Sequence, residues 1–345
     1  MKIPKTLRWQ SSGSTLGQGG QGQVVVVTDS TGELSGEFAL KGLTKGKPAK
    51  AYERFAREVE AIKQLDCPSI IKIVDHSQPG DDFQYYVMEF HPDAESLKKL
   101  MASGRNPFAG DCIKATEFFV RLVEAFAHWE ELGFAHRDLS PANVLVLPDE
   151  TIKIIDFGLC QMPENEAITL TDEGVGTQNY MAPECEAGAP EGITSIADLY
   201  SIGKLLWSAI TNKMAFARET SAYNDKSMPK EFPDLPEAWH LHHLFEGTVR
   251  HKPTDRFPSS SAAIKCARRV QHLVRAGHPP LEILMQGRCP SCGWGLLKSF
   301  EQSHMVFGNP NPSGIASLQC EYCGECFAVN RKGPKALLQS RASLS

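Results

Sequence analysis

The sequence of 345 residues has no apolar run near the length of about 18 residues that a membrane-spanning helix needs. Its first residues, 1–5, lack the apolar core of a secretory signal peptide. There is no internal repeat and no long low-complexity tract, so a fibrous or disorder-dominated chain is not expected. Charge of one sign is also not in large excess, because the formal net charge is -5. We therefore expect a cytoplasmic globular protein with no membrane partner and no overall attraction to nucleic acid.

The composition is ordinary for a globular protein, with 41% hydrophobic and 22% charged residues. The length suffices for two or three domains. The 10 cysteines are unevenly placed, because half of them lie within residues 289–326. In a chain of this length without a secretion signal, cysteines favour reduced thiols or metal ligands over a disulfide framework. The uneven placement indicates a separate carboxy-terminal module.

Two apolar runs in the middle of the chain, 144–147 and 152–155, are rich in β-branched residues. The residues between them, 148–151, have turn chemistry, so the segment is predicted to form an antiparallel hairpin. Pairing the first residue of one run with the last residue of the other sets Asn143 opposite Asp156. An amide oxygen beside a carboxylate suits a hard cation such as Mg²⁺. The simpler alternative is that these two residues only cap the hairpin.

Glycines gather near the amino terminus, in the segment 16–24 with the sequence LGQGGQGQV. Gly17, Gly19 and Gly22 would let backbone amides approach a phosphate where a Cβ would intrude. A strand over 24–27 is predicted directly afterwards, so the pattern is not the dinucleotide-binding fingerprint, which opens a helix. By itself the pattern also fits a flexible surface hairpin.

A lysine and a glutamate form a second predicted pair. In the predicted strand 37–43, Lys41 shares a face with the small residue Ala39, so its side chain can reach into a cleft. The predicted helix 51–65 places Glu58 at the border of its apolar stripe. A buried carboxylate needs a cation, since an unpaired buried charge costs several kcal/mol. We therefore expect Lys41 to pair with Glu58.

These features are part of a longer series of motifs along the chain. After the glycine segment, Lys41 and Glu58 come HRDLSPAN at 136–143 and Asp-Phe-Gly at 156–158. In this order and spacing the sequence resembles a eukaryotic-type, or Hanks-type, serine/threonine protein kinase. Further matches are GTQNYMAPE at 176–184, Asp198 within ADLYSIG and Arg256 within PTDRF.

The resemblance covers residues 9–275 and implies a bilobal α+β protein kinase fold. The β-rich N-lobe would span about 9–88, and the α-rich C-lobe would span about 92–275. A small zinc-ribbon-like domain would follow.

The resemblance implies a role for each catalytic residue. Lys41, held by Glu58, would contact the α- and β-phosphates of ATP. Asn143 and Asp156 would hold Mg²⁺ or Mn²⁺. Asp138 would orient the substrate hydroxyl and accept its proton. Most of the catalysis would then be positioning and charge neutralisation.

The resemblance also implies a nucleotide pocket below the glycine segment. Met88 matches the gatekeeper position, and Glu89, Phe90 and His91 match the hinge that meets adenine. Glu95 falls where family members often bind the ribose. The residues that would enclose the base are Leu16, Val24, Ala39 and Leu145.

Three other matches imply architecture rather than chemistry. Glu184 and Arg256 would form a buried ion pair. Asp198 would brace the catalytic loop from beneath.

One position departs from the family pattern, because Ser140 stands where serine/threonine kinases usually have a lysine that touches the γ-phosphate. Loss of one transition-state donor typically lowers a rate about 10²- to 10³-fold. We expect reduced but real activity. The alternative is a pseudokinase scaffold that recruits partners through the carboxy-terminal module. A small-molecule kinase of related fold is a third alternative, which the glycine segment and the 182–184 match disfavour.

The resemblance favours alcohol hydroxyls of protein substrates, because Thr177 matches the threonine that serine/threonine-specific members place beside the catalytic aspartate. Arg137 next to Asp138 is typical of members that a phosphate on the activation segment switches on. Thr169 and Thr171 are the candidates for that phosphate, with autophosphorylation expected. The alternative is a standing negative charge from Asp172 and Glu173.

The carboxy-terminal cysteines form two Cys-x-x-Cys-Gly knuckles. Four thiolates can bind one Zn²⁺ tetrahedrally, and a module of about fifty residues would take much of its stability from the metal. The module resembles a zinc ribbon over 288–330, with a linker over 276–287 and a flexible tail over 331–345. Cys326 is a competing ligand, and a redox pair is the competing function. The predicted ligands are Cys289, Cys292, Cys320 and Cys323.

The partner of this module is less defined by the sequence. Its charge is only mildly basic, so a protein partner or autoregulation is expected and nucleic acid stays open. His304 is a possible substitute zinc ligand. The histidines at 240, 242 and 243 are expected on a helix surface rather than in a metal site.

Overall fold

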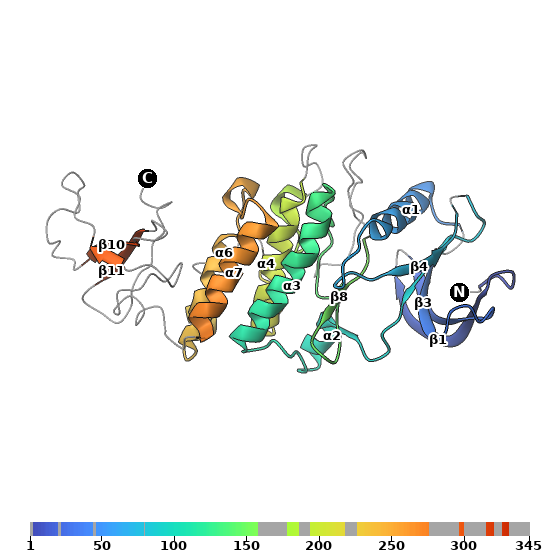
Figure 1. Ribbon diagram of the computed structural model, residues 1–345, viewed down its shortest axis with the longest axis horizontal. Helices are drawn as coiled ribbons and strands as arrows, with labels where there is room; N and C mark the ends of the chain where they lie inside the picture. The colour runs from blue at the N-terminus through green and yellow to red at the C-terminus, as the bar shows by residue number, and fades with distance from the viewer. Residues whose placement is uncertain are drawn as a thin grey trace.

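The computed structural model describes residues 3–19, 22–43, 46–78, 80–157, 178–185, 194–217 and 226–275, together with the backbone of three strands farther along. Figure 1 shows a sheet with one helix at the amino-terminal side and a group of long helices next to it. These two parts are the β-rich and α-rich lobes of a bilobal fold, which confirms the two-lobed part of the predicted fold class.

The amino-terminal lobe is a five-stranded antiparallel sheet with the strand order β1-β2-β3-β5-β4. Helix α1 (Ala49–Lys63) covers one face of it. On the other face, Leu40 packs in a cluster with Trp9 and Val87, whereas the preceding residue, Ala39, belongs to the main core. Successive side chains of β3 therefore point to opposite faces of the sheet, as predicted for this strand. The strands are β1 (Trp9–Gly19), β2 (Gly22–Asp29), β3 (Glu37–Gly42), β4 (Ile73–His76) and β5 (Tyr85–Glu89).

The second lobe is helical. Its central helix α4 is almost wholly buried, which fits its nearly continuous apolar sequence. Helix α3 begins at an N-cap, because the Asp111 side chain accepts from the backbone N–H of Lys114 at 2.9 Å. The α-helices are α2 (Leu97–Ala102), α3 (Cys112–Glu131), α4 (Ile196–Thr211), α5 (Met228–Glu231), α6 (His242–Glu246) and α7 (Ser260–Arg275). The 3₁₀ turns are η1 (Pro183–Cys185), η2 (Pro236–Leu241) and η3 (Pro253–Asp255).

The predicted hairpin is present, with β7 (Val144–Val146) paired to β8 (Ile152–Ile154) and β6 (Glu95–Ser96) on the outer side of β7. Its predicted register is wrong by one residue. Val144 pairs with Ile154, and the backbone N–H of Ile155 donates to the carbonyl of Asn143, so Asn143 faces Ile155. The reason is a shorter loop: Glu150 adopts a left-handed conformation (φ 65°), which closes a three-residue turn.

A separate three-stranded antiparallel sheet lies near the carboxyl end, with the order β11-β10-β9. Its strands are β9 (Leu297–Ser299), β10 (Ile315–Cys320) and β11 (Cys326–Asn330). Of the four predicted zinc ligands, Cys320 ends β10, whereas Cys289, Cys292 and Cys323 lie outside the described residues. Among the described residues, no helix is both long and apolar enough to cross a membrane.

Candidate active site

The predicted lysine–glutamate pair is present between β3 and α1. The ammonium of Lys41 lies 2.7 and 2.9 Å from the two carboxylate oxygens of Glu58. Both side chains are buried, with exposed fractions of 6% for Lys41 and 1% for Glu58. Tyr86 on the neighbouring strand β5 donates its hydroxyl to Glu58 at 2.7 Å. The buried carboxylate therefore has two donors, as its burial requires.

Tyr86 is a site residue that the sequence reasoning missed. Its position follows from the sheet register, because Lys41 on β3 pairs directly with Tyr86 on β5. The signal in the sequence would have been the register of two strands separated by more than forty residues, which no local pattern gives. In the structure the ring also lies near the ammonium of Lys41, at 5.7 Å from ring centroid to nitrogen.

Lys41 also connects the two lobes. Its ammonium lies 3.3 Å from Oδ1 of Asp156, which follows β8. Burial alone would lower the pKa of Lys41, but the carboxylates of Glu58 and Asp156 raise it well above its usual value. Asp156 itself has a left-handed backbone (φ 64°), an uncommon conformation for a residue with a side chain and one that occurs often at functional sites. The lysine is thus held as a cation at the junction of the lobes.

Asp138 and Asn143 are brought together by the loop before β7. The side-chain amide of Asn143 donates to the backbone carbonyl of Asp138 at 2.8 Å and to its Oδ2 at 3.0 Å. Because both hydrogen bonds use Nδ2, the orientation of the amide is fixed and its Oδ1 points elsewhere. Ser140 lies inside this loop with 4% of its surface exposed, and its carbonyl accepts from the N–H of Asn143 at 3.0 Å.

Asp198 of helix α4 braces this loop, as predicted. Its carboxylate accepts from the backbone N–H groups of His136 at 2.7 Å and Arg137 at 2.9 Å. A third donor, the indole N–H of Trp129 on α3, lies at 2.9 Å. These contacts hold Arg137 in a left-handed conformation (φ 65°). The strained backbone turns the loop so that the next residue, Asp138, enters the site.

An aromatic cluster packs behind the loop. The His136 ring lies 4.4 Å from Phe157 and 6.0 Å from Trp129, measured between ring centroids. Burial lowers the pKa of His136 to about 4, so its imidazole is neutral at pH 7. Phe157, the middle residue of the predicted Asp-Phe-Gly motif, is 1% exposed. Gly158 lies outside the described residues.

The residues predicted to enclose a base come from both lobes. Ala39 is buried, Val24 packs partly against the core, and Leu16 on β1 is 48% exposed. In β7, Leu145 is half-buried between the buried Val144 and Val146. Its side chain therefore leaves the core on the opposite side of the strand from its neighbours.

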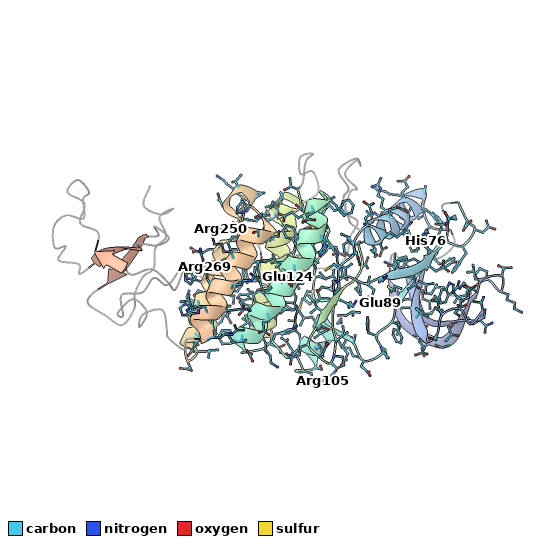
Figure 2. All side chains as sticks on the ribbon, in the orientation of Figure 1. His76, Glu89, Arg105, Glu124, Arg250 and Arg269 are labelled. Carbon is cyan, nitrogen blue, oxygen red and sulfur yellow. The ribbon has the colours of Figure 1, made fainter. Side chains whose placement is uncertain are left out.

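Glu89, at the end of β5, uses its side chain to join segments of the two lobes (Figure 2). Its Oε1 accepts from the ammonium of Lys153 on β8 at 2.6 Å and from the backbone N–H of Lys72 at 3.0 Å. Nε2 of His91 lies 3.3 Å from its other oxygen. The carboxylate of Glu89 is thus already engaged by Lys153, by the Lys72 backbone and by the neighbouring His91 ring.

Glu95, the predicted ribose contact, is engaged by two cations. Arg105 donates to both carboxylate oxygens at 2.5 and 2.9 Å, and Lys99 lies at 2.7 Å. The hydrogen bonds from Arg105 and Lys99 lower the pKa of Glu95 to about 2. A ribose hydroxyl would have to share this carboxylate with both cations.

The glycine segment forms the end of the β1–β2 hairpin, where Gly19 pairs with Gly22. A Cβ on Gly22 would lie 2.7 Å from the carbonyl oxygen of Gly42, and its φ is +151°. The neighbouring strand therefore requires this glycine, independently of any phosphate. A Cβ on Gly17 would meet no atom within 4 Å, so this position is open.

The predicted pair of Glu184 and Arg256 is present in the helical lobe. Arg256 donates from both terminal nitrogens to the two carboxylate oxygens, with Nη2 at 2.7 Å from Oε2. Arg256 is 5% exposed, whereas the side chain of Glu184 keeps 20% of its surface. The pair joins η1 to the segment before α7, far from the lysine cluster in sequence. The candidates Thr169, Thr171 and Thr177, with the acids 172 and 173, lie outside the described residues.

The site joins two lobes. Lys41 on a strand pairs with Glu58 on a helix, and both lie opposite Asp156 and the loop that Asp198 braces. This arrangement defines the protein kinase class of fold and site. In agreement, the family model described as "Protein kinase domain" matches residues 11–266. The chain belongs to this family.

Curated relatives agree with this assignment. The chain is 28% identical over 312 residues to the "Serine/threonine-protein kinase PksC" of Streptomyces coelicolor, covering 87% of this chain and 55% of that protein. It is 29% identical over 208 residues to "Serine/threonine-protein kinase PrkC" of Bacillus subtilis, covering 60% of this chain and 31% of that protein. The chain therefore spans about a third to just over half of the length of these relatives.

Among solved structures, a point mutant of the kinase domain of PknI from Mycobacterium tuberculosis has a similar fold. The TM-score is 0.59 at 22% identity, and the match covers 78% of this chain and 99% of that one. At this identity the likeness concerns the fold.

Proposed function

We propose that this chain transfers the γ-phosphoryl group of ATP to serine or threonine hydroxyls of protein substrates, with Mg²⁺ or Mn²⁺ as cofactor. The observation that supports this most is the Lys41–Glu58 pair whose ammonium also lies 3.3 Å from Asp156. A buried cation held by carboxylates from both lobes is suited to the phosphates of a nucleotide. The names of the curated relatives support the serine/threonine class.

The cation would be held by Asn143 and Asp156. The fit rests on chemistry seen in the site: the Asn143 amide is fixed through Nδ2, so the atom it can offer a cation is its Oδ1. Amide and carboxylate oxygens are the ligands that Mg²⁺ prefers. When bound, the cation would neutralise charge on the phosphates. In the observed hairpin register Asp156 lies one residue beyond the pairing partner of Asn143, and its backbone is left-handed.

Asp138 would accept the proton of the substrate hydroxyl. Its carboxylate is oriented by Asn143, and its backbone N–H faces Nδ1 of His136 at 3.3 Å. Because His136 is neutral, this ring nitrogen can accept. The side chain of Asp138 is therefore positioned before any substrate binds, which reduces the entropy cost of the reaction.

The nucleotide would lie between the lobes. Gly17, Gly19 and Gly22 would cover the phosphates. The hinge from Glu89 to His91 would meet adenine through its backbone, and Glu95 would approach the ribose. Leu16, Val24, Ala39 and Leu145 would enclose the base.

Ser140 leaves this site with one cation fewer than serine/threonine kinases usually have. Turnover should therefore be slow rather than absent, because Lys41 and the bound cation still neutralise the phosphates. Activation by phosphate on Thr169 or Thr171, through autophosphorylation, is part of the proposal. Thr177 would favour alcohol hydroxyls.

We further propose a kinase domain over residues 9–275, a linker over 276–287 and a zinc-ribbon-like module over 288–330. Its ligands would be Cys289, Cys292, Cys320 and Cys323, and its partner a protein. The position of Cys320 at the end of an antiparallel strand supports a ribbon, in which knuckles follow strand ends.

The experiment for the catalytic proposal is a radiolabelled ATP assay with the full chain and a generic protein substrate. Wild type should transfer phosphate, and Asp138→Asn should lose at least about 10²-fold in rate while still binding ATP. Asp93→Asn, at an exposed site next to the hinge, is the matched control and should keep the wild-type rate.

Ser140→Lys is expected to raise the rate in the same assay, since it restores a cation near the phosphates. A wild-type rate no higher than that of Asp138→Asn would contradict the enzyme and favour the scaffold.

A further inference from the structure

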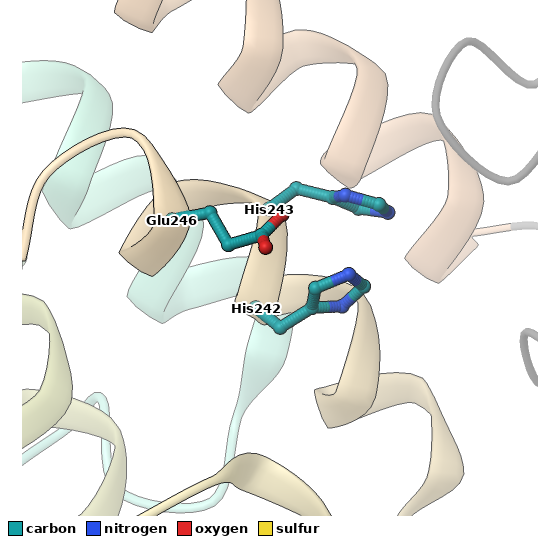
Figure 3. A group of neighbouring side chains, drawn as sticks. All are labelled: His242, His243 and Glu246. Atoms are coloured by element: carbon teal, nitrogen blue, oxygen red, sulfur yellow. The ribbon is translucent and has the colours of Figure 1, made fainter. Parts of the chain in front are cut away.

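Three side chains in the helical lobe form a cluster that the kinase site does not use. One ligand atom each of His242, His243 and Glu246 lies within 4.8 Å of the others. Figure 3 shows both imidazole rings and the carboxylate projecting from the short helix α6. In the part of the chain that the structure describes, no other group of three His, Cys, Asp or Glu side chains is gathered in this way.

The sequence predicted these histidines on a helix surface, and the structure places them deeper than an open surface. His240, in the preceding 3₁₀ turn, is fully buried, and His242 and His243 are half-buried. The two rings of His242 and His243 are in contact, with 3.8 Å between centroids. The apolar neighbours Leu244 and Phe245 anchor the helix in the core and leave these polar side chains on its other side.

His243 has a ring nitrogen that lacks a partner. Its Nε2 is shielded from solvent and makes no hydrogen bond within the described part of the protein. A shielded polar atom without a partner costs about 1–3 kcal/mol, so such atoms usually have a function or a bound group. A metal ion bound at the cluster would give Nε2 of His243 a partner.

The helix that presents these side chains is fixed in place. Gly247 ends α6 beneath the ring of Phe257, and a Cβ there would lie 2.2 Å from that ring. The hydroxyl of Thr248 donates to the carbonyl of Leu244 at 2.6 Å, and the N–H of Val249 donates to that of Phe245 at 2.8 Å. A rigid scaffold of this kind keeps the ligand atoms close together before a metal binds.

The surroundings permit a metal. Arg250 is a cation close to Glu246, with 3.9 Å between Nη2 and Oε1, and its side chain is 40% exposed. Its Nε donates to the backbone carbonyl of Glu246 rather than to the carboxylate. The guanidinium thus makes only a long ion pair with the carboxylate, which leaves the carboxylate able to serve as a ligand.

We propose that His242, His243 and Glu246 form a binding site for a divalent transition metal of the Zn²⁺ class. Two imidazoles and one carboxylate suit Zn²⁺, Ni²⁺ or Cu²⁺, whereas Mg²⁺ prefers oxygen ligands alone. Ligands at about 2.0–2.1 Å around a tetrahedral Zn²⁺ are about 3.3 Å apart, so the atoms need to close by about 1.5 Å at most. Three protein ligands would leave one position for water.

The test is a zinc titration of the full, reduced, metal-free chain against a chromophoric chelator. Wild type should bind one equivalent of Zn²⁺ more than His243→Gln or Glu246→Gln. At this site the variants should bind at least about tenfold more weakly, since loss of an outer-shell partner alone costs about 10–100-fold. His251→Gln, an exposed histidine of the same lobe, is the matched control and should bind like wild type.

Two further measurements separate this site from other metal sites. Co²⁺ bound in place of Zn²⁺ should keep its thiolate charge-transfer absorption in both variants, because the missing equivalent has no sulfur ligand. Millimolar Mg²⁺ should not displace the Zn²⁺ bound at the His242, His243 and Glu246 site. Thermal unfolding without metal, followed by circular dichroism, should be unchanged in Glu246→Gln, which guards against a folding effect. Equal zinc binding by wild type and Glu246→Gln would overturn the proposal. So would a variant that loses the thiolate absorption together with the additional equivalent of metal.

Discussion

At the scale of single residues, burial fixes the charge state of the groups around the catalytic loop. Lys41 stays a cation because two carboxylates surround it, and His136 stays neutral because nothing opposes its burial strongly enough. Burial thus leaves Lys41 charged and His136 neutral, and the carboxylates next to Lys41 make the difference. Tyr86 adds a hydrogen bond to Glu58, so the carboxylate has a second donor besides Lys41.

His136 leads to a prediction about pH. The imidazole has its ordinary pKa of 6.5 in the unfolded chain and about 4 when folded, so the unfolded state binds the proton more tightly. Its contribution to stability is therefore present above pH 6.5 and is lost as the pH falls toward 4. We expect about 2 kcal/mol less free energy of unfolding at pH 5 than at pH 7 from this residue.

Urea unfolding at both pH values, followed by tryptophan fluorescence, measures this loss, because Trp129 lies beside the ring. His136→Phe should remove that part of the pH dependence. His128→Gln, exposed on the same helix as Trp129, should keep it. A pH dependence that is the same in His136→Phe and wild type would show that the ring does not titrate in this way.

At the scale of elements, the β1–β2 hairpin contains glycines with different reasons to be glycine. Gly22→Ala places a Cβ 2.7 Å from the Gly42 carbonyl at a φ of +151°, and we expect a loss of about 1–3 kcal/mol in stability. Gly17→Ala meets open space and should change stability by less than about 0.5 kcal/mol. Thermal unfolding of both variants checks the contrast.

Activity assays of the same pair extend this comparison to the proposed function. If the phosphates approach the backbone at Gly17, the Gly17→Ala chain should have a raised KM for ATP despite its normal stability. Similar stability of the two variants would contradict the packing argument for Gly22.

At the scale of the whole molecule, the lobes are joined by ion pairs as well as by the chain. Lys41 reaches Asp156, and Lys153 of β8 reaches Glu89 at the end of β5. Parallel pairing of Ile70 with Ile154 ties the same strand to the segment before β4. These contacts link the two lobes at points other than the proposed hinge.

Lys153→Met tests this joint. The pair is partly exposed, so its loss should lower stability by only about 1 kcal/mol. It should also raise the KM for ATP a few-fold, because the hinge backbone would lose its fixed position, and leave the KM for the protein substrate unchanged. Lys213→Met, which removes an exposed lysine paired with Glu231 in the helical lobe, should leave both constants unchanged. A rise in both KM values in Lys153→Met would indicate a general loss of structure instead.

The sequence alone determined the order of motifs, the Lys41–Glu58 pair, the bracing role of Asp198 and the two-lobed architecture. The Lys41–Glu58 pair follows from local periodicity and from the need of a buried charge for a partner. The role of Asp198 and the two lobes follow from the resemblance to protein kinases, which rests on the order and spacing of the motifs. The sequence did not determine the hairpin register, because a left-handed Glu150 shortens the turn by one residue.

Only the tertiary structure decided several further contacts between groups on separate elements. Tyr86 on Glu58, Arg105 on Glu95, and Lys153 on Glu89 each join segments that no local pattern relates. The burial of the α6 histidines was decided in the same way, since their sequence alone also fits an exposed helix. Strand register and helix packing place these side chains, and both depend on the whole core.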